Sequence, residues 1–279
     1  MRAIRLAITA AKGGVGKSTL AINLAGFLAK EQNCRVLLID TDSQSSTSQF
    51  FLPPEEVDYL PTERTTAAIY DESFIADPEL VIHKTKFENL DFIPASDRLE
   101  KFNLPEPQKA GEMQFALREF LSEVGNNYHF IVMDTPPLMA SLQTWGCLLA
   151  TDFVLTPLVM ESFSIQAIAK VDRMITAASQ QNPNLSFLGY IVNLRNKNRS
   201  IQNANETTLR AVHGDRVFSN VVTNLTAYSE AQAMRQPITE YTRSGSAVAI
   251  TQLLCTEILG RIQKNLENRK TKTNDRRAA

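Results

Sequence analysis

The stretch "ITAAKGGVGKSTLAINLA", residues 8–25, follows a short apolar run and leads into a helical pattern. Its glycines allow positive φ angles and let the backbone approach a phosphate closely. The amides at the start of the following helix would face that negative charge. In this pattern the lysine reaches the β- and γ-phosphates and the hydroxyl binds Mg²⁺. We therefore predict a phosphate-binding loop, formed by Gly13, Gly14, Val15, Gly16, Lys17, Ser18 and Thr19.

One feature of this loop is unusual. Phosphate loops of this kind generally open with a glycine, but position 11 holds Ala11 and a second lysine, Lys12, follows it. By itself, Lys12 would be interpreted as a solvated lysine at the end of a strand.

On either side of the loop, short apolar runs alternate with longer helical patterns. Runs such as "VLLI" and "FIVM" are apolar throughout, as in strands buried on both faces of a parallel sheet. The expected strands are Ile4–Thr9, Arg35–Ile39, Leu90–Pro94, Phe130–Met133, Phe153–Pro157, Phe187–Val192 and Val217–Val222. The expected helices are Ser18–Lys30, Glu112–Val124, Ser162–Ser179, Ile201–His213, Tyr228–Arg235 and Ala247–Leu266. This alternation predicts a doubly wound α/β fold with a mostly parallel sheet and its ligand at the carboxyl ends of the strands.

The length of 279 residues suits one large α/β domain or two small ones. We expect a single domain over residues 1–267, with loops and short helices over Phe51–Phe87. Residues 268–279 are polar and basic, which predicts a flexible tail. Regular patterning starts within the first few residues, so we expect no preceding helix-turn-helix domain.

Three scattered cysteines form no CxxC pair, and three scattered histidines make a histidine-based metal site improbable. The apolar N-terminus is short for a signal peptide. The most apolar later stretch, "WGCLLATDFVLTPLVM", is interrupted by Asp152 and Pro157 and is too short to span a membrane. A cytoplasmic protein is expected.

Acidic residues end two of the predicted strands. "VLLIDTDSQ" ends at Asp40 and Asp42, and "HFIVMDTPP" ends at Asp134, followed by Pro136 and Pro137. A nucleotide hydrolase needs a carboxylate near its metal ion. The two prolines prevent regular structure from continuing and suit a loop that responds to the γ-phosphate.

Together these segments resemble the ParA/MinD family of P-loop ATPases over nearly the whole chain. "AAKGGVGKST" is similar to the family's deviant Walker A motif, KGGxGKS/T, and "DTPP" resembles its Walker B and switch II segment. "VLLIDTDSQSSTS" resembles switch I, "TDFVLTPLVMESFSIQAI" the next strand and helix, and "SEAQAMRQPITEY" a C-terminal stretch of the ParA branch. The most similar group is the ParA-type partition ATPases that lack an N-terminal helix-turn-helix domain.

The resemblance implies roles for individual residues. Two protomers sandwich two ATP molecules, and Lys12 matches the extra lysine that crosses the interface to the partner's nucleotide. Lys17 and Asp42 match catalytic positions, Asp42 being the acid that orients the attacking water. Ser18, Asp40 and Asp134 match positions near Mg²⁺. Asn193 matches a strand end near adenine, although a structural asparagine cap fits this position equally well.

Two segments depart from the family pattern. The switch I segment often reads DxDPQ followed by glycine, but here it reads "DTDSQSS". A proline common after the later strand is missing from "NVVTNLT".

The charges are divided unevenly along the chain. Residues 1–194 carry 15 basic and 23 acidic residues, whereas residues 195–279 carry 14 basic and 7 acidic ones. Dimers of the resembled group bind double-stranded DNA without sequence preference through basic residues toward the C-terminus, and a ParB-like partner stimulates their slow ATP hydrolysis. Cations in an array suffice for phosphate contact. The DNA-binding candidates are Arg195, Lys197, Arg199, Arg243, Arg261 and Lys264.

The interpretation is therefore an ATP-dependent DNA partition ATPase that associates with the nucleoid when it holds ATP. Two alternatives stay open: a MinD-like membrane-associated positioning ATPase, and a ParA-like ATPase that positions a protein cargo. The C-terminal apolar stripe of Ile258, Leu259, Ile262 and Leu266 is followed by no aromatic or large apolar residue. It is therefore expected to pack in the core, and no stable membrane anchor is expected.

Overall fold

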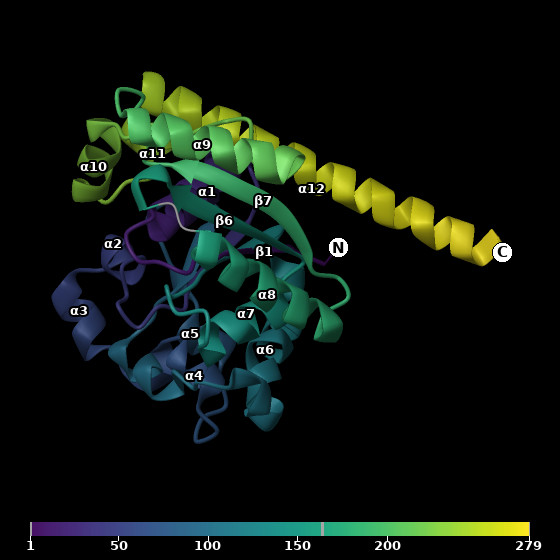
Figure 1. Ribbon diagram of the computed structural model, residues 1–279. Helices are drawn as coiled ribbons and strands as arrows, with labels where there is room; N and C mark the ends of the chain where they lie inside the picture. Colours follow the sequence, from purple (N-terminus) through teal and green to yellow (C-terminus); the bar gives the residue numbers. More distant parts are fainter. Residues whose placement is uncertain (1, 163–164, 279) are drawn as a thin grey trace.

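The computed structural model describes residues 2–162 and 165–278 and contains a seven-stranded sheet in the order β3-β4-β2-β5-β1-β6-β7 (Figure 1). All neighbouring strands are parallel except β3, which runs antiparallel to β4. The strands are β1 (Ile4–Ile8), β2 (Val36–Asp40), β3 (His83–Lys84), β4 (Leu90–Ile93), β5 (Phe130–Asp134), β6 (Phe153–Val159) and β7 (Ser186–Asn193). The predicted doubly wound, mostly parallel sheet is confirmed.

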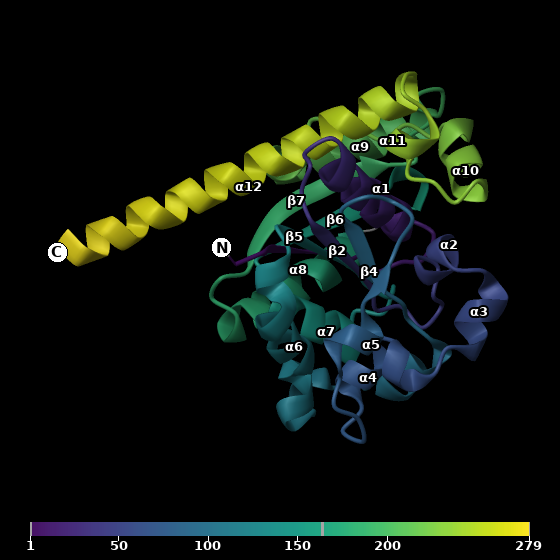
Figure 2. The same cartoon turned by 180° about the vertical axis from the view of Figure 1, so that it is seen from behind.

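Helices cover both faces of the sheet (Figures 1 and 2). They are α1 (Lys17–Lys30), α2 (Ser48–Phe51), α3 (Pro54–Tyr59), α4 (Ala67–Tyr70), α5 (Pro78–Val81), α6 (Ala116–Val124), α7 (Leu142–Ala150), α8 (Ile165–Gln181), α9 (Ser200–His213), α10 (Thr226–Ala233), α11 (Ile238–Tyr241) and α12 (Ser246–Ala278). Short 3₁₀ turns include Gly111–Phe115 and Met160–Ser162.

The strands alternate their side chains between two cores. Leu37 and Ile39 of β2 face the core under α4, α6 and α7, while Val36 and Leu38 face the core under α1 and α12. This two-sided burial is why the strands read as continuous apolar runs rather than as alternating ones.

The expected strand at Val217–Val222 is wrong. This segment makes only isolated parallel bridges to the end of β7, Tyr190 with Val217 and Arg195 with Thr223. Its centre is held by a side chain instead, because the backbone amides of Ser219 and Asn220 donate to the carboxylate of Glu257. A segment whose amides are satisfied by a side chain cannot form a continuous ladder.

Several helix boundaries also differ from the prediction. The first part of the expected Glu112–Val124 helix is a 3₁₀ turn, and α7 was not predicted. Part of the expected start of Ser162–Ser179 lies outside the described residues, and α8 is described from Ile165. The last helix was expected to end at Leu266, but α12 continues to Ala278 and extends past the body of the molecule (Figures 1 and 2). The division into one domain and a flexible tail stays a prediction.

The stripe of Ile258, Leu259, Ile262 and Leu266 on α12 packs in the core beside α1, as expected. Within the described ranges, no helix is both long and apolar enough to cross a bilayer.

Candidate nucleotide-binding site

The predicted phosphate loop joins the end of β1 to the start of α1. Gly14 and Gly16 have φ angles of 70° and 82°, which favour glycine. Gly16 is the N-cap of α1 and brings no capping side chain, so the first amides of the helix are not capped by that residue. A loop of this geometry can receive an anion at the helix N-terminus.

Asn193, at the end of β7, supports this loop from the side. Its Nδ2 donates to the Val15 carbonyl at 2.8 Å, and the side chain is buried. A Cβ atom on Gly16 would lie only 2.3 Å from this Nδ2. Of the two interpretations of Asn193, the structural contact is the one present here, and Asn193 also lines the adjoining cavity.

The two strands that end in aspartate, β5 and β2, lie on the same side of β1 in the sheet. β5 lies between β1 and β2, and its Asp134 pairs in register with Ile8 and Asp40. Both carboxylates are completely buried. The three predicted elements therefore meet at one edge of the sheet, at the carboxyl ends of the strands.

Asp134 has one oxygen in use and one without a partner. Its Oδ2 accepts a hydrogen bond from Thr47 Oγ1 at 2.8 Å, whereas Oδ1 has no hydrogen-bond partner among the described residues. Burial raises the pKa of Asp134, although the nearby Ser18 hydroxyl and the charge of Lys17 oppose this. A buried acceptor without a partner is costly, so it fits a cation or a metal-bound water at this position.

Asp40 uses both of its oxygens on the segment that follows it. Oδ1 accepts from the Asp42 amide at 3.0 Å, and Oδ2 accepts from the amide and hydroxyl of Ser48 at 2.8 and 2.7 Å. Burial and the nearby charge of Asp134 raise the pKa of Asp40. In this conformation Asp40 holds the loop between β2 and α2, and its role toward Mg²⁺ stays a prediction.

Lys17 is buried and lies near the charges of Asp134 and Asp42. Burial lowers its pKa, and those two carboxylates raise it in part. Asp42 is also buried, and its Oδ1 accepts from the Gln44 amide at 3.1 Å. Lys12, in contrast, is exposed at the mouth of the loop. The nucleotide and catalytic assignments of these residues stay predictions.

No group of three or more histidine, cysteine, aspartate or glutamate side chains forms a metal cluster in the part of the chain that is described. The predicted set of Ser18, Asp40 and Asp134 supplies a hydroxyl and two carboxylates. Mg²⁺ prefers oxygen ligands and keeps several waters, so this set fits an ion that phosphate oxygens and waters also bind.

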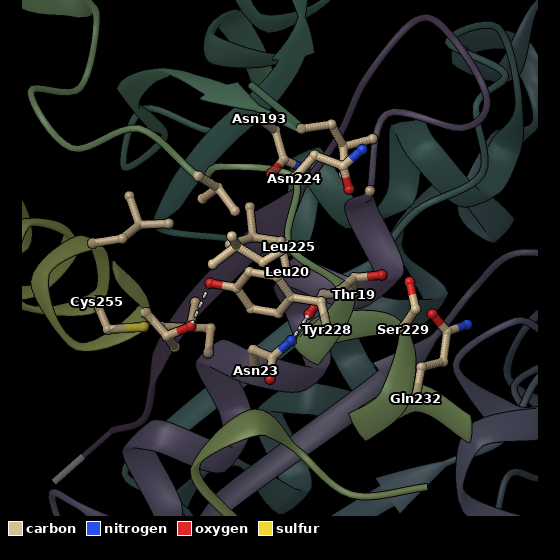
Figure 3. Close-up of a pocket in the computed structure, with 16 residues that line it drawn as sticks. Thr19, Leu20, Asn23, Asn193, Asn224, Leu225, Tyr228, Ser229, Gln232 and Cys255 are labelled. Carbon is tan, nitrogen blue, oxygen red and sulfur yellow. Dashed lines mark hydrogen bonds between the residues drawn. The ribbon is translucent and has the colours of Figure 1, made fainter. Parts of the chain in front are cut away.

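A cavity of about 120 Å³ opens beside the phosphate loop (Figure 3). It lies among α1, the end of β7, α10 and α12, and Thr19, Asn193 and Asn224 line it near the loop. The other lining residues are mainly apolar, including Leu20, Leu24, Val222, Leu225, Leu254 and Cys255. Tyr228 also lines the cavity, and its hydroxyl donates a hydrogen bond to the Ala247 carbonyl at 3.0 Å. An apolar slot with a few polar groups is typical of a site for a planar organic ligand.

Sequence reasoning did not identify Thr47, Ser48, Asn224 and Tyr228 as parts of the site. The first two belong to the hydroxyl-rich "SSTS" that follows Asp42, and that composition was the available signal. The other two lie on segments whose position depends on tertiary packing, and no local pattern indicates them.

The six DNA-binding candidates differ in exposure. Lys197, Arg199, Arg243 and Lys264 are exposed, and Arg199 forms an ion pair with Glu161. Arg195 is buried, and its Nε donates to Glu206 at 2.7 Å. Arg261 donates to the carbonyls of Leu188, Asp215 and Val217. Both arginines thus donate hydrogen bonds within the protein, and the DNA-binding assignment of the six residues stays a prediction.

Comparison with known proteins gives consistent results. The profile of the AAA domain family matches residues 2–187. The chromosome partitioning protein ParA of Caulobacter vibrioides is 32% identical over 243 residues, covering 85% of this chain and 86% of that protein.

Two solved structures are also similar to this chain. A putative plasmid partition protein of Borrelia burgdorferi, bound to AMPPNP, is 26% identical with a TM-score of 0.71, covering 95% of this chain and 100% of that one. Cobyrinic acid a,c-diamide synthase of Mycobacterium smegmatis, bound to an ATP analogue and magnesium, is 20% identical with a TM-score of 0.70. It covers 86% of this chain and 91% of that one, and shows the shared fold. With this profile, this level of identity and the phosphate-loop edge just described, the chain belongs to the ParA/MinD family of P-loop ATPases.

Proposed function

We propose that this chain is a DNA partition ATPase whose ATP-bound sandwich dimer binds DNA nonspecifically. A ParB-like partner protein stimulates slow hydrolysis and releases the dimer from DNA. The observation that carries this proposal is the meeting of the phosphate loop, Asp40 and Asp134 at the ends of three adjacent strands, beside an apolar cavity. The names of the relatives, which include chromosome and plasmid partition proteins, support the biological role.

The arrangement suggests where each part of the nucleotide lies. The phosphates occupy the loop in front of α1, and Thr19 lies between the loop and the cavity. The base enters the cavity, where the amides of Asn193 and Asn224 offer both donors and acceptors to its edge. Apolar side chains cover its faces.

The catalytic groups follow from the same placement. Lys17 neutralises charge on the phosphates, and Ser18 and Asp134 hold the hydrated Mg²⁺, which supplies charge stabilisation when bound. Asp42 orients the attacking water. Lys12 reaches the partner protomer's nucleotide, so that its favourable contact exists only in the dimer and couples ATP binding to dimerisation.

The DNA-binding surface is expected to use the candidates whose side chains are exposed. Lys197, Arg243 and Lys264 meet this condition, and Arg199 can contribute if its ion pair with Glu161 opens. Contacts between cations and phosphates make such binding strongly dependent on salt.

Binding to a random-sequence duplex tests the proposal, measured without nucleotide, with ADP and with ATP across a salt series. Binding that requires ATP and weakens with salt is expected. Lys17→Ala should abolish nucleotide binding, and Asp42→Ala should trap an ATP-bound dimer. If Asp42→Ala hydrolyses ATP at the parental rate, the catalytic assignment is wrong. Dimerisation on ATP without DNA binding would favour the membrane alternative, which lipid vesicles then test.

A further inference from the structure

Residues 217–225, called here the cavity-wall segment, run from the 3₁₀ turn Gly214–Arg216 to the start of α10. Its last residues, Val222, Asn224 and Leu225, line the cavity beside the phosphate loop. Both of its ends bond to the region of β7: the Phe218 amide donates to the Tyr190 carbonyl, and the Val222 amide donates to the Val192 carbonyl. Between these two anchors, no backbone hydrogen bond joins the segment to the sheet in the part of the chain that the structure describes.

Glu257 of α12 fills that gap. One carboxylate oxygen accepts from the Ser219 amide at 2.8 Å, and the other accepts from the amide and side chain of Asn220 at 2.9 and 2.8 Å. These hydrogen bonds, together with that from Arg261, lower the pKa of Glu257 although burial raises it. A charged acceptor that takes several hydrogen bonds holds a loop more strongly than a neutral one.

Arg261, one turn further along α12, holds the start of the same segment. Its guanidinium donates to the Val217 carbonyl at 3.0 Å and lies 4.0 Å from the centre of the Phe218 ring. It also pairs with Glu257 at 2.9 Å. The two side chains therefore clamp residues 217–220 onto α12.

The same helix forms part of the cavity itself. Thr251, Leu254 and Cys255 of α12 line it, and Tyr228 lies within 3.0 Å of the Thr251 hydroxyl and the Ala247 carbonyl (Figure 3). Glu257 lies two residues beyond this lining and does not line the cavity. The hydrogen bonds of Glu257 to Ser219 and Asn220 connect it to the cavity through the cavity-wall segment.

We propose that Glu257 is a positioning residue for the nucleotide base, because it fixes the cavity-wall segment that carries Val222, Asn224 and Leu225. This rests on the proposed function, in which the base occupies the cavity. A consequence is that α12 is coupled to nucleotide affinity.

The test compares two ligands that share the phosphates and differ in the base: ATP and inorganic tripolyphosphate, each with Mg²⁺. Calorimetry measures both dissociation constants for the parent chain, for Glu257→Gln and for the matched control Glu267→Gln. Glu267 lies on the exposed side of the same helix, and its carboxylate bonds to Gln263. Loss of the charge-assisted clamp should weaken ATP binding about tenfold in Glu257→Gln while tripolyphosphate changes less than about twofold. The control should change neither.

A second variant guards against misfolding. Asn220→Ala removes one of the donors to Glu257 and leaves the helix intact, and it should weaken ATP binding in the same selective way. Combined with Asn224→Ala, Glu257→Gln should be non-additive, since both act on one wall. Equal weakening of both ligands, no weakening in correctly folded Glu257→Gln, or strict additivity would each overturn the inference. A parent chain that binds neither ligand would instead refute the proposed function.

Discussion

Replacing Gly16 by alanine tests how the phosphate loop is built. Gly16 has a φ of 82°, and its Cβ position lies 2.3 Å from Asn193 Nδ2. Alanine in the left-handed region costs about 1–2 kcal/mol. The added methyl also displaces the Asn193 amide, which breaks its hydrogen bond to the Val15 carbonyl in a buried site. An unsatisfied buried donor costs about 1–3 kcal/mol.

Gly14 provides the matched comparison. Its φ of 70° is also left-handed, but among the described residues no atom beyond its chain neighbours lies within 4 Å of its Cβ position. Gly14→Ala should therefore lower the free energy of unfolding by the conformational cost alone, about 1–2 kcal/mol. Gly16→Ala should lower it by about 2–5 kcal/mol, the sum of both costs.

Urea denaturation of both variants and of Asn193→Ala gives the three free energies. In the double variant Gly16→Ala with Asn193→Ala, the methyl group has room, so the second change should cost much less than it does alone. Equal destabilisation by Gly14→Ala and Gly16→Ala, or strict additivity of Gly16→Ala with Asn193→Ala, would refute the reasoning.

Three further predictions follow from the contacts. Ser45→Gly should raise the free energy of unfolding by about 0.5–1 kcal/mol in urea denaturation, because Ser45 has a φ of 54° and glycine relieves that cost. Arg195→Ala should destabilise the fold by about 1–3 kcal/mol, since it removes buried hydrogen bonds while Glu206 keeps its ion pair with Arg210, whereas the exposed Lys197→Ala should leave thermal stability unchanged and weaken DNA binding. Arginines donate hydrogen bonds to Glu206 and Glu257, and backbone amides also donate to Glu257. These bonds lower the pKa of each carboxyl below its ordinary value of 4.5. The ionised carboxylates therefore stabilise the fold above that pH, and this contribution is lost as the pH falls further. Denaturation of the doubly substituted Glu206→Gln, Glu257→Gln chain should accordingly show a shallower loss of stability in acid than the parent.

The positions of most strands and of the phosphate loop were predictable from the sequence. Buried parallel strands leave a plain signal, because each is a continuous apolar run bounded by polar residues. The helix α7 has no comparable sequence signal. All residues of "LQTWGCLLA" are buried, so the helix has no exposed polar face and no 3.6-residue alternation of polar and apolar residues. The wrongly predicted strand at Val217–Val222 has the apolar pattern of a strand. Two of its backbone amides, however, bond to Glu257, which lies far along the chain, and not to a neighbouring strand.

The distribution of charge along the sequence does not show which basic side chains are exposed. Arg195 and Arg261 count toward the positive C-terminal part of the chain, but their guanidinium groups satisfy carbonyls and carboxylates inside the fold. Arginine can donate five hydrogen bonds in fixed directions, which suits it to such internal bracing as well as to phosphate. Sequence composition cannot separate these two uses, because the difference lies in tertiary contacts.

The departure of "DTDSQSS" from the family pattern has a structural resolution at one residue. Ser45 occupies the position where glycine commonly follows DxDPQ, and it keeps the left-handed φ that glycine would adopt without cost. Its amide donates to the Asp42 carbonyl at 2.8 Å, which closes a tight turn immediately after the proposed catalytic acid. The ends of this turn are fixed, because Asp40 bonds to Ser48 and Thr47 bonds to Asp134. Hydrogen bonds fix the loop at its ends, and its left-handed φ lies at Ser45, shortly after the proposed catalytic Asp42. The hydrogen bond between Thr47 and Asp134 fixes the end of the loop near α2. A bound nucleotide that displaced this hydrogen bond would release that end, so the loop could change conformation when the nucleotide binds.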